Sequence, residues 1–282
     1  MEFFQIYKPL TASPFFRDAT YREYNPCEAL KPYIRCFWGS EKPYIMREST
    51  GMGGAVIPDT CMDIIIDVNF TENRMVSGFC GINDTSFYSE GKAELFSEFS
   101  TFAIRFYPWS AVLFAEESMK KVRNEFFDAG EYFSYVKREI EPFFFDITTM
   151  EERISLVETV LLKHFHPERE NRILMNCMGE LLKRQGNIKI NKLAEEVHVS
   201  SRQIERIFSE NIGITPKSFA SLVRYQCVWR EALYQRNFSV QDTVCKFGYT
   251  DQAHLLHEFK KYHRVTLREA VESARQNVAI LQ

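Results

Sequence analysis

Two stretches near the C-terminus, residues 190–219 and 240–270, repeat one pattern of residue types at an offset of 51 residues. The matched pairs are Leu193 with Val244, Ser200 with Asp251, Ile204 with Leu255, Phe208 with Phe259, Ile214 with Val265 and Thr215 with Thr266. Each copy has a short apolar-periodic segment, a tight turn opened by a helix-capping residue, and a second segment with apolar positions four apart. This pattern predicts one helix-turn-helix in each copy.

The second helix of the first copy should begin at Ser201. Ser200 is a good N-cap, and Gln203, three residues on, completes a capping box. The apolar positions turn inward, so the outer stripe consists of Arg202, Glu205, Arg206 and Ser209. Such a stripe can contact base edges, because Arg binds guanine through two hydrogen bonds and Glu accepts one from cytosine. A single copy fits an ordinary helical hairpin equally well, but the tandem repeat favours the DNA-binding interpretation.

A long helix over residues 216–235 is expected to join the two copies. Thr215 is its N-cap, and Pro216 occupies the first helical position, where its missing N–H costs nothing. Twenty residues at 1.5 Å each give roughly 30 Å, close to one turn of B-DNA. The two second helices could therefore enter successive major grooves on one face of double-stranded DNA.

Residues from about 186 to 272, roughly a third of the chain, resemble the DNA-binding domain of AraC/XylS-type bacterial transcription regulators. The residues that carry the resemblance are Leu193-Ala194, Ser200, Arg206-Ile207-Phe208 and Ile212-Gly213-Ile214-Thr215-Pro216 in the first copy, and Phe247-Gly248-Tyr249, Asp251-Gln252-Ala253-His254 and Phe259-Lys260-Lys261 in the second. Such regulators act on operator DNA, and RNA polymerase is a partner that the resemblance implies.

The resemblance also implies which residues contact DNA. Base contacts fall on Arg202, Glu205 and Arg206, next to Ser201, in the first copy, and on Gln252, Ala253 and His257 in the second, where His254, Lys260 and Lys261 lie near the DNA backbone. The chain departs from the family after this helix, because Arg264 replaces a Gly that commonly ends a helix at positive φ. Either mild strain or another turn is expected there, which leaves the docking of the second copy open.

The charge distribution agrees with a division of the chain. Residues 186–282 hold 14 Lys and Arg against 10 Asp and Glu, a net charge of +4, whereas residues 1–185 carry −7 of the total −3. We expect a β-rich sensing and dimerisation domain over residues 1–170 and the DNA-binding domain over 171–282, with a linker at 168–171 and a first helix at 174–184. Within the second domain the modules should span about 190–213 and 239–263.

The N-terminal 110 residues read as short β-branched and aromatic runs separated by turn residues, which is typical of a small barrel or sandwich. The expected strands are 32–39, 54–58, 61–68, 74–79 and 99–106. Candidates for the inner face are Phe37, Trp38, Phe79, Phe87, Tyr88, Phe102, Phe106 and Trp109. Core packing is the simpler role for these rings. A ligand pocket that includes Trp38, Phe79 and Phe106 is the sharper alternative.

Residues 56–59 and 104–108 look like segments of a cupin-like N-terminal domain of unknown function found before AraC-type DNA-binding domains. That resemblance implies a sensing or dimerising module with a small-molecule effector. Asp59, after Pro58, most simply bonds local backbone N–H groups in a turn. The fold class expected for the whole chain is α+β: a β-barrel-like domain with following helices, then an all-α domain with two helix-turn-helix modules.

Helices are expected at 110–121, 128–140 and 151–165. The last carries Ile154, Val157, Leu161 and Phe165 at helical spacing, a stripe that normally packs on its own domain. In AraC-type proteins the same helices commonly pair protomers, which makes a homodimer through 151–165 the alternative.

An enzyme is the main competing class, and the chain lacks its usual motifs. Residues 1–163 contain no His, so a His-rich metal site is not expected, and GxSxG, P-loop and HExxH motifs are absent. The Gly-rich residues 51–54 most simply serve a turn. We therefore expect no catalytic residues, metal or cofactor. A redox sensor using Cys61 or Cys80, or a Cys-based alkyl-transfer protein, stays as the alternative.

No run reaches 18 apolar residues, and the first ten residues lack a basic region and an apolar signal core, so we expect a cytoplasmic protein without membrane contact. The function that we infer from the sequence is a DNA-binding transcription regulator controlled by a ligand or partner of its N-terminal domain.

Overall fold

The computed structural model describes residues 3–16, 20–45, 55–88 and 96–279. After the short helix α1 (Phe3–Ile6), the first half of the chain is mainly strands. Their bounds are β1 Arg22–Tyr24, β2 Ile34–Gly39, β3 Tyr44–Ile45, β4 Ala55–Val56, β5 Met62–Asn69, β6 Arg74–Cys80, β7 Phe87–Tyr88, β8 Glu98–Phe106 and β9 Phe126–Asp128. The Gly-rich residues 51–54 lie outside the described ranges.

The strands form one seven-stranded antiparallel sheet, ordered β1-β2-β8-β5-β6-β9 with β3 also paired to β8, and a separate ribbon of β4 and β7. The long central pairing aligns Ile64 with Ile104 and Asp63 with Arg105. Because neighbouring residues of a strand point to opposite faces, these two rows belong to different faces of the sheet.

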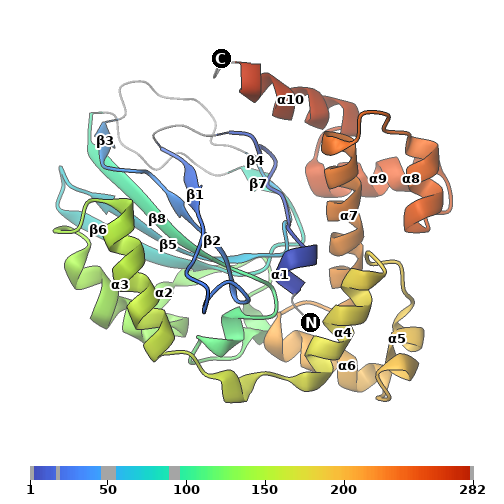
Figure 1. Cartoon of the computed structure of the whole chain (residues 1–282), viewed down its shortest axis with the longest axis horizontal. Helices are drawn as coiled ribbons and strands as arrows, with labels where there is room; N and C mark the ends of the chain where they lie inside the picture. Colours follow the sequence, from blue (N-terminus) through green and yellow to red (C-terminus); the bar gives the residue numbers. More distant parts are fainter. Residues whose placement is uncertain (1–2, 17–19, 46–54, 89–95, 280–282) are drawn as a thin grey trace.

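The apolar face of the sheet carries the core of the N-terminal half. Phe37, Ile64, Phe79 and Ile104 are fully buried there, and the Phe79 ring contacts Phe133 edge-on at 5.0 Å. Helices α2 (Ala129–Tyr132) and α3 (Met150–Lys163) lie on the same side of the molecule (Figure 1).

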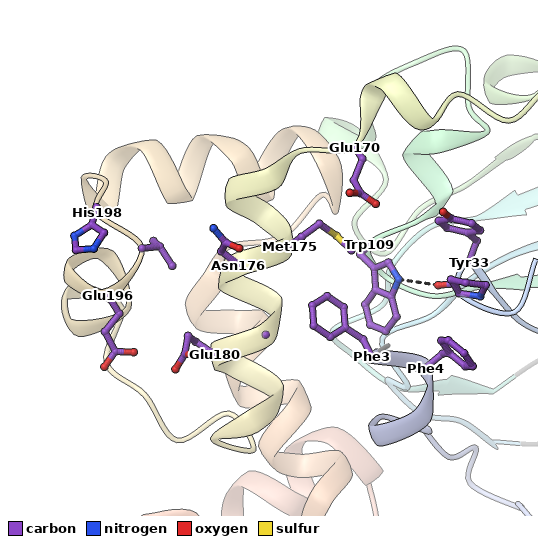
Figure 2. Close-up of a pocket in the computed structure, with 13 residues that line it drawn as sticks. Phe3, Phe4, Tyr33, Trp109, Glu170, Met175, Asn176, Glu180, Glu196 and His198 are labelled. Carbon is purple, nitrogen blue, oxygen red and sulfur yellow. Dashed lines mark hydrogen bonds between the residues drawn. The ribbon is translucent and has the colours of Figure 1, made fainter. Parts of the chain in front are cut away.

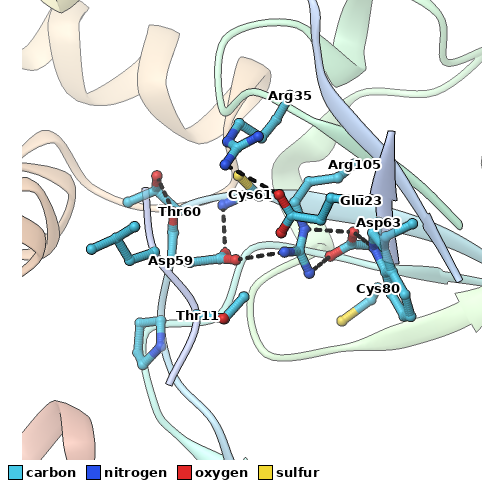
Figure 3. A network of polar contacts seen from close by, with 12 residues as sticks. Thr11, Glu23, Arg35, Asp59, Thr60, Cys61, Asp63, Cys80 and Arg105 are labelled. Atoms are coloured by element: carbon cyan, nitrogen blue, oxygen red, sulfur yellow. Dashed lines mark hydrogen bonds and ion pairs between the residues drawn. The ribbon is translucent and has the colours of Figure 1, made fainter. Parts of the chain in front are cut away.

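The opposite face carries a polar network (Figure 3). Arg105 lies between two carboxylates: its Nε is 2.9 Å from Asp63 and its Nη1 is 3.5 Å from Asp59. Asp63 also accepts a 2.8 Å hydrogen bond from Trp38. Asp59 accepts a hydrogen bond from the Cys61 N–H at 2.9 Å, so the expected turn role of Asp59 is confirmed and the ion pair is added to it. Burial of these charges is offset by their mutual pairing.

Two of the expected helices are wrong in part. Residues 110–121 form only two 3₁₀ turns, Ala111–Leu113 and Met119–Lys121, because residues 113–115 are all buried and the Glu116 N–H bonds to the Tyr132 carbonyl. Residues 128–140 start with the capping box of Asp128 and Glu131 but break at Phe133, whose ring packs against Phe79 and Phe106. A wide turn, Val136–Ile140, follows.

Other expectations for the N-terminal half have mixed outcomes. Phe87 and Tyr88 are 37% and 46% exposed, so their assignment to the inner face is wrong; they belong to the separate ribbon. The helix expected at 151–165 is confirmed as α3, and Val157 and Leu161 are fully buried in their own domain. Pairing of protomers through this helix stays a proposal.

The C-terminal half is entirely helical in the described residues. Its helices are α4 Arg172–Lys183, α5 Ile190–Glu196, α6 Ser201–Asn211, α7 Pro216–Tyr234, α8 Val240–Phe247, α9 Gln252–His263 and α10 Leu267–Ala279. The expected α+β class, with a β domain, following helices and two modules joined by a long helix, is confirmed. Helix α7 stands between the strands and the second module, with α6 and α9 near its opposite ends (Figure 1).

Candidate nucleic-acid interface

Helix α6 is the second helix of the first module. The Ser200 hydroxyl accepts the Gln203 N–H at 3.2 Å, so the helix begins at Ser201 as predicted. Ile204, Ile207 and Phe208 are buried. The opposite stripe, Arg202, Glu205 and Arg206, is exposed, while Ser201 is half-buried and its hydroxyl donates to Asn191 at 3.1 Å. Among the described residues, the ion pair of Arg206 is the loose one with Glu210, at 3.7 Å, which leaves the guanidinium able to turn toward a base.

Helix α9 occupies the equivalent place in the second module. Asp251 caps it by accepting the His254 N–H at 2.7 Å, and Leu255, Phe259 and Tyr262 are buried beneath it. Six predicted contact residues are exposed along it: Gln252, Ala253, His254, His257, Lys260 and Lys261. The His254 ring packs edge-on against Tyr249 at 5.2 Å, which places it beside the turn.

Leu256 was missed by the sequence analysis. It lies one residue after the buried Leu255, and it is 41% exposed between Gln252 and Lys260 on the outer side of α9. An apolar residue just off the buried stripe was the available signal. Such a side chain can contact a thymine methyl group in the major groove.

Helix α7 sets the separation of the two modules. Its 19 residues correspond to roughly 28 Å, and Thr215 caps it by accepting the Ser218 N–H at 3.1 Å. The second module is fixed to it by Arg224, which binds both carboxylate oxygens of Glu258 at 2.9 Å. Glu258 also accepts the Tyr249 hydroxyl at 2.7 Å, so α7, the turn and α9 share one polar cluster.

The backbone of the turn after α9 shows which of the two alternatives expected at Arg264 the chain adopts. Arg264 ends the helix at a φ of 64°, the left-handed conformation that a Gly adopts more easily. The mildly strained alternative is therefore the one adopted. Its side chain is exposed.

The N-terminal half contacts α7 directly. The Gln226 side chain is buried; its amide donates to the carbonyls of Leu10 at 3.1 Å and Pro58 at 2.8 Å, and its oxygen accepts the Leu10 N–H at 2.8 Å. Trp229, one turn on, donates to the Thr11 carbonyl at 3.0 Å. The helix that spaces the modules is thus hydrogen-bonded to the β domain.

The three residues suggested for a ligand pocket lie on opposite faces of the sheet. Phe79 and Phe106 are fully buried and both pack on Phe133. Trp38 is half-buried on the polar face, where it donates a hydrogen bond to Asp63, so its assignment to the inner face is wrong. A ligand role for them stays a prediction. A hollow at the border of the β domain lies elsewhere, where α1 and Trp109 meet α4 (Figure 2).

The two cysteines considered for redox sensing lie in environments that favour the neutral thiol. Cys61 is buried, and burial, with Asp59 adding to it, raises its pKa well above the usual value. Burial, with Asp63 adding to it, raises the pKa of Cys80 to about 11. Because the thiolate is the reactive form, neither position favours redox or alkyl-transfer chemistry.

The described residues hold neither a metal-binding cluster nor a membrane-spanning helix. No cluster of three or more His, Cys, Asp and Glu side chains has a geometry that could hold a metal ion. No helix within those ranges combines the length and apolar character needed to cross a bilayer.

Both halves of the chain match known sequence families. Residues 193–273 match a family described as "Helix-turn-helix domain", and residues 22–128 match "Domain of unknown function (DUF6597)". An "Uncharacterized HTH-type transcriptional regulator" from Haemophilus influenzae is 30% identical over 112 residues, which are 40% of this chain and 36% of that protein. The chain thus matches just over a third of that relative's length.

Solved structures with some similarity include a Chromobacterium violaceum transcriptional regulator with an AraC-type DNA-binding domain, at 20% identity and a TM-score of 0.34, covering 37% of this chain and 93% of that one. Apo ToxT from Vibrio cholerae is 11% identical, with a TM-score of 0.40, over 89% of this chain and 99% of that one. The similarity to an AraC-type DNA-binding domain expected for the C-terminal part is confirmed by the family match and the relative.

Proposed function

We propose that this chain, whose C-terminal part is an AraC-type helix-turn-helix domain, is a transcription regulator that binds operator DNA and responds to its N-terminal domain. One observation carries the proposal: two equivalent helices, α6 and α9, present exposed polar stripes near opposite ends of one rigid helix. An ordinary packed hairpin would not repeat such a stripe, whereas a reader of two successive major grooves needs it.

The exposed side chains suggest a division of labour on the DNA. Arg202 and Arg206 suit guanine and Glu205 suits cytosine, because their hydrogen-bonding groups match those base edges. In α9, Gln252 suits adenine. Lys260 and Lys261 are exposed near the end of that helix, where they can neutralise phosphates.

Control by the N-terminal domain is supported by the buried Gln226. Its amide satisfies three backbone groups of residues 10 and 58, so a shift of that segment would leave buried polar groups without partners unless α7 moved with it. A ligand or partner that binds one arrangement of the β domain would therefore bias the placement of the modules. A small-molecule effector, RNA polymerase and a second protomer are the partners included in this proposal.

The test is to select duplexes from a random library with the full chain and to footprint the enriched sequence. Two protected patches about 10 bp apart, centre to centre, on one face of the duplex are expected. Binding should weaken with rising salt, since lysine and arginine contacts release counterions. Failure to enrich any sequence, with the folded chain verified by circular dichroism, would contradict the proposal.

A further inference from the structure

A cavity of about 510 Å³ lies along the exposed side of α4 and is lined by residues from both sides of this helix (Figure 2). One of its walls belongs to the N-terminal half and includes Phe3, Tyr33 and Trp109. Residues 196–198, which are the last residue of α5 and the start of the turn that joins α5 to α6, form the other wall. The size is that of a site for a small organic ligand. A molecule that fills the cavity would contact both the β domain and the turn that precedes α6.

The aromatic wall is held in place before any ligand binds. Trp109 donates to the Pro32 carbonyl at 3.0 Å and stacks on Tyr107, with ring centroids 4.7 Å apart. Phe3 contacts the same indole edge-on at 5.5 Å. Tyr33 packs on Phe165 at 4.6 Å. Fixed rings reduce the entropy lost on binding. Tyr33 is the half-buried ring of this wall, whereas Phe3 and Trp109 are 6% and 3% exposed and offer the cavity only a small part of their surface.

The polar part of the lining is acidic. Its charged side chains are Glu170, Glu180 and Glu196, and no Lys or Arg contributes to it. Glu180 and Glu196 share one cation, Arg184, through contacts of 3.2 and 2.5 Å. Glu170 has no such partner among the described residues, and its carboxylate points over the cavity between Tyr33 and Met175 (Figure 2). The three carboxylates therefore keep a net negative charge that a bound cation would offset.

We infer that this cavity binds an organic ammonium ion with an aromatic or apolar body, and that this class of molecule is the effector in the function proposed above. The body packs on Tyr33 and on the small exposed parts of Trp109 and Phe3, and the ammonium group faces Glu170. Anionic ligands are disfavoured by the acidic lining. His198, in the turn that precedes α6, lines the same cavity, so an occupant that reaches across α4 contacts the approach to α6.

The experiment uses the full chain and phenethylammonium as the probe, with 3-phenylpropionate as the anion of similar size. Isothermal titration calorimetry should show binding of the cation only. Glu170→Gln should weaken it about fivefold, the effect of losing one exposed charge pair. Asn176→Arg places a cation and bulk in the cavity from an exposed position of α4, so it should weaken binding at least about tenfold.

Two matched variants control for charge alone. Glu168→Gln removes a carboxylate outside the lining, and Ser155→Arg adds a cation at an exposed position of α3; both should bind the probe as the wild type does. The probe should also change operator affinity of the wild type but not of Asn176→Arg, as linkage requires.

Three results would overturn the inference: equal binding of the anion, binding that Asn176→Arg leaves unchanged, or no binding of the cation up to about 10 mM, beyond the range of weak small-molecule sites. If the chain binds its selected duplex while the probe fails, the cavity inference alone is wrong. If the probe binds as described but no duplex is selected, the proposed function is wrong and the site stands.

Discussion

The two helix-turn-helix modules end at equivalent positions with different residues. Gly213 and Arg264 are 51 residues apart, and both have a left-handed backbone, with φ of 91° and 64°. A Cβ on Gly213 would lie 2.6 Å from the Met119 carbonyl oxygen and 2.8 Å from the Val122 side chain, whereas Arg264 is exposed. The first module therefore needs Gly because the β domain packs against its turn. The backbone angle alone tolerates Arg at a modest cost.

The modules also differ in what they present to DNA and in what holds them. The first presents charged groups, Arg202, Glu205 and Arg206, and is packed against the β domain. The second presents an amide, imidazoles and Leu256 beside two lysines, Lys260 and Lys261, and Arg224 fixes it to α7. Hence the first module is suited to respond to the β domain, whereas the second is suited to stay at a fixed distance from the first along α7.

The largest expected effect tests whether both modules bind the same duplex at the fixed distance set by α7. Inserting 5 bp between the two protected patches turns the second site to the opposite face of the duplex. Binding by one protomer should lose the contribution of one module, about 2–5 kcal/mol, half of a usual specific-over-non-specific difference. Fluorescence anisotropy measures the loss, and a 10 bp insertion serves as a second spacing. Unchanged affinity with 5 bp inserted would mean that only one module reads DNA.

Gly213→Ala tests the contact that distinguishes the first turn. The alanine must adopt a positive φ, and its methyl group must displace Met119 or Val122, so the free energy of unfolding should fall by about 2–4 kcal/mol. Urea denaturation followed by circular dichroism measures it. Gly248→Ala is a partial control, since that position also has positive φ but faces the Asn187 side chain, which can move. A loss no larger than that of Gly248→Ala would argue against a special role for the interdomain contact.

His263, inside the second module, is expected to make the stability of the chain depend on pH. It is buried against Phe259, bonded to the Tyr225 hydroxyl at 2.8 Å, and burial lowers its pKa to about 4. The unfolded chain takes up this proton near its ordinary pKa of about 6.5, so stability from the neutral form is lost as pH falls from 6.5 to 4, by up to about 3 kcal/mol. The free energy of unfolding of the wild type, relative to that of His263→Phe, should therefore fall as the pH falls through this range. A difference that stays constant with pH would contradict the assignment.

A smaller effect separates base contacts from phosphate contacts. Arg206→Ala should cost about 1–3 kcal/mol on the selected duplex and little on random DNA, because Arg206 contacts a base edge. Lys261→Ala should weaken both duplexes similarly and reduce the salt slope by about one. Anisotropy titrations at several salt concentrations distinguish the two patterns. If Arg206→Ala weakens both duplexes equally, Arg206 contacts the backbone instead.

Local signals were sufficient for the helical modules. Ser200, Thr215 and Asp251 cap the expected helices, since a cap depends on residues three positions away. Non-local contacts decided the rest. Phe133 breaks a helix because Phe79 and Phe106 draw its ring into the core. A Gln among apolar residues of α7 signals a buried partner, but nothing local points to Leu10, 216 residues earlier. The lining of the cavity beside Trp109 comes from several separate segments of the chain, so no single stretch of the sequence predicts it.

The smallest expected effect returns to the turn of the second module. Arg264→Gly relieves the left-handed strain of a non-Gly residue, about 1–2 kcal/mol, while Gly loses more backbone entropy on folding, about 0.5–1 kcal/mol. The net gain in the free energy of unfolding should be about 0.5–1 kcal/mol, measured by urea denaturation. Arg264→Ala, which keeps a Cβ but removes the charge, should leave stability near that of the wild type. If Arg264→Ala stabilises the chain as much as Arg264→Gly, side-chain charge rather than backbone strain accounts for the difference between the two turns.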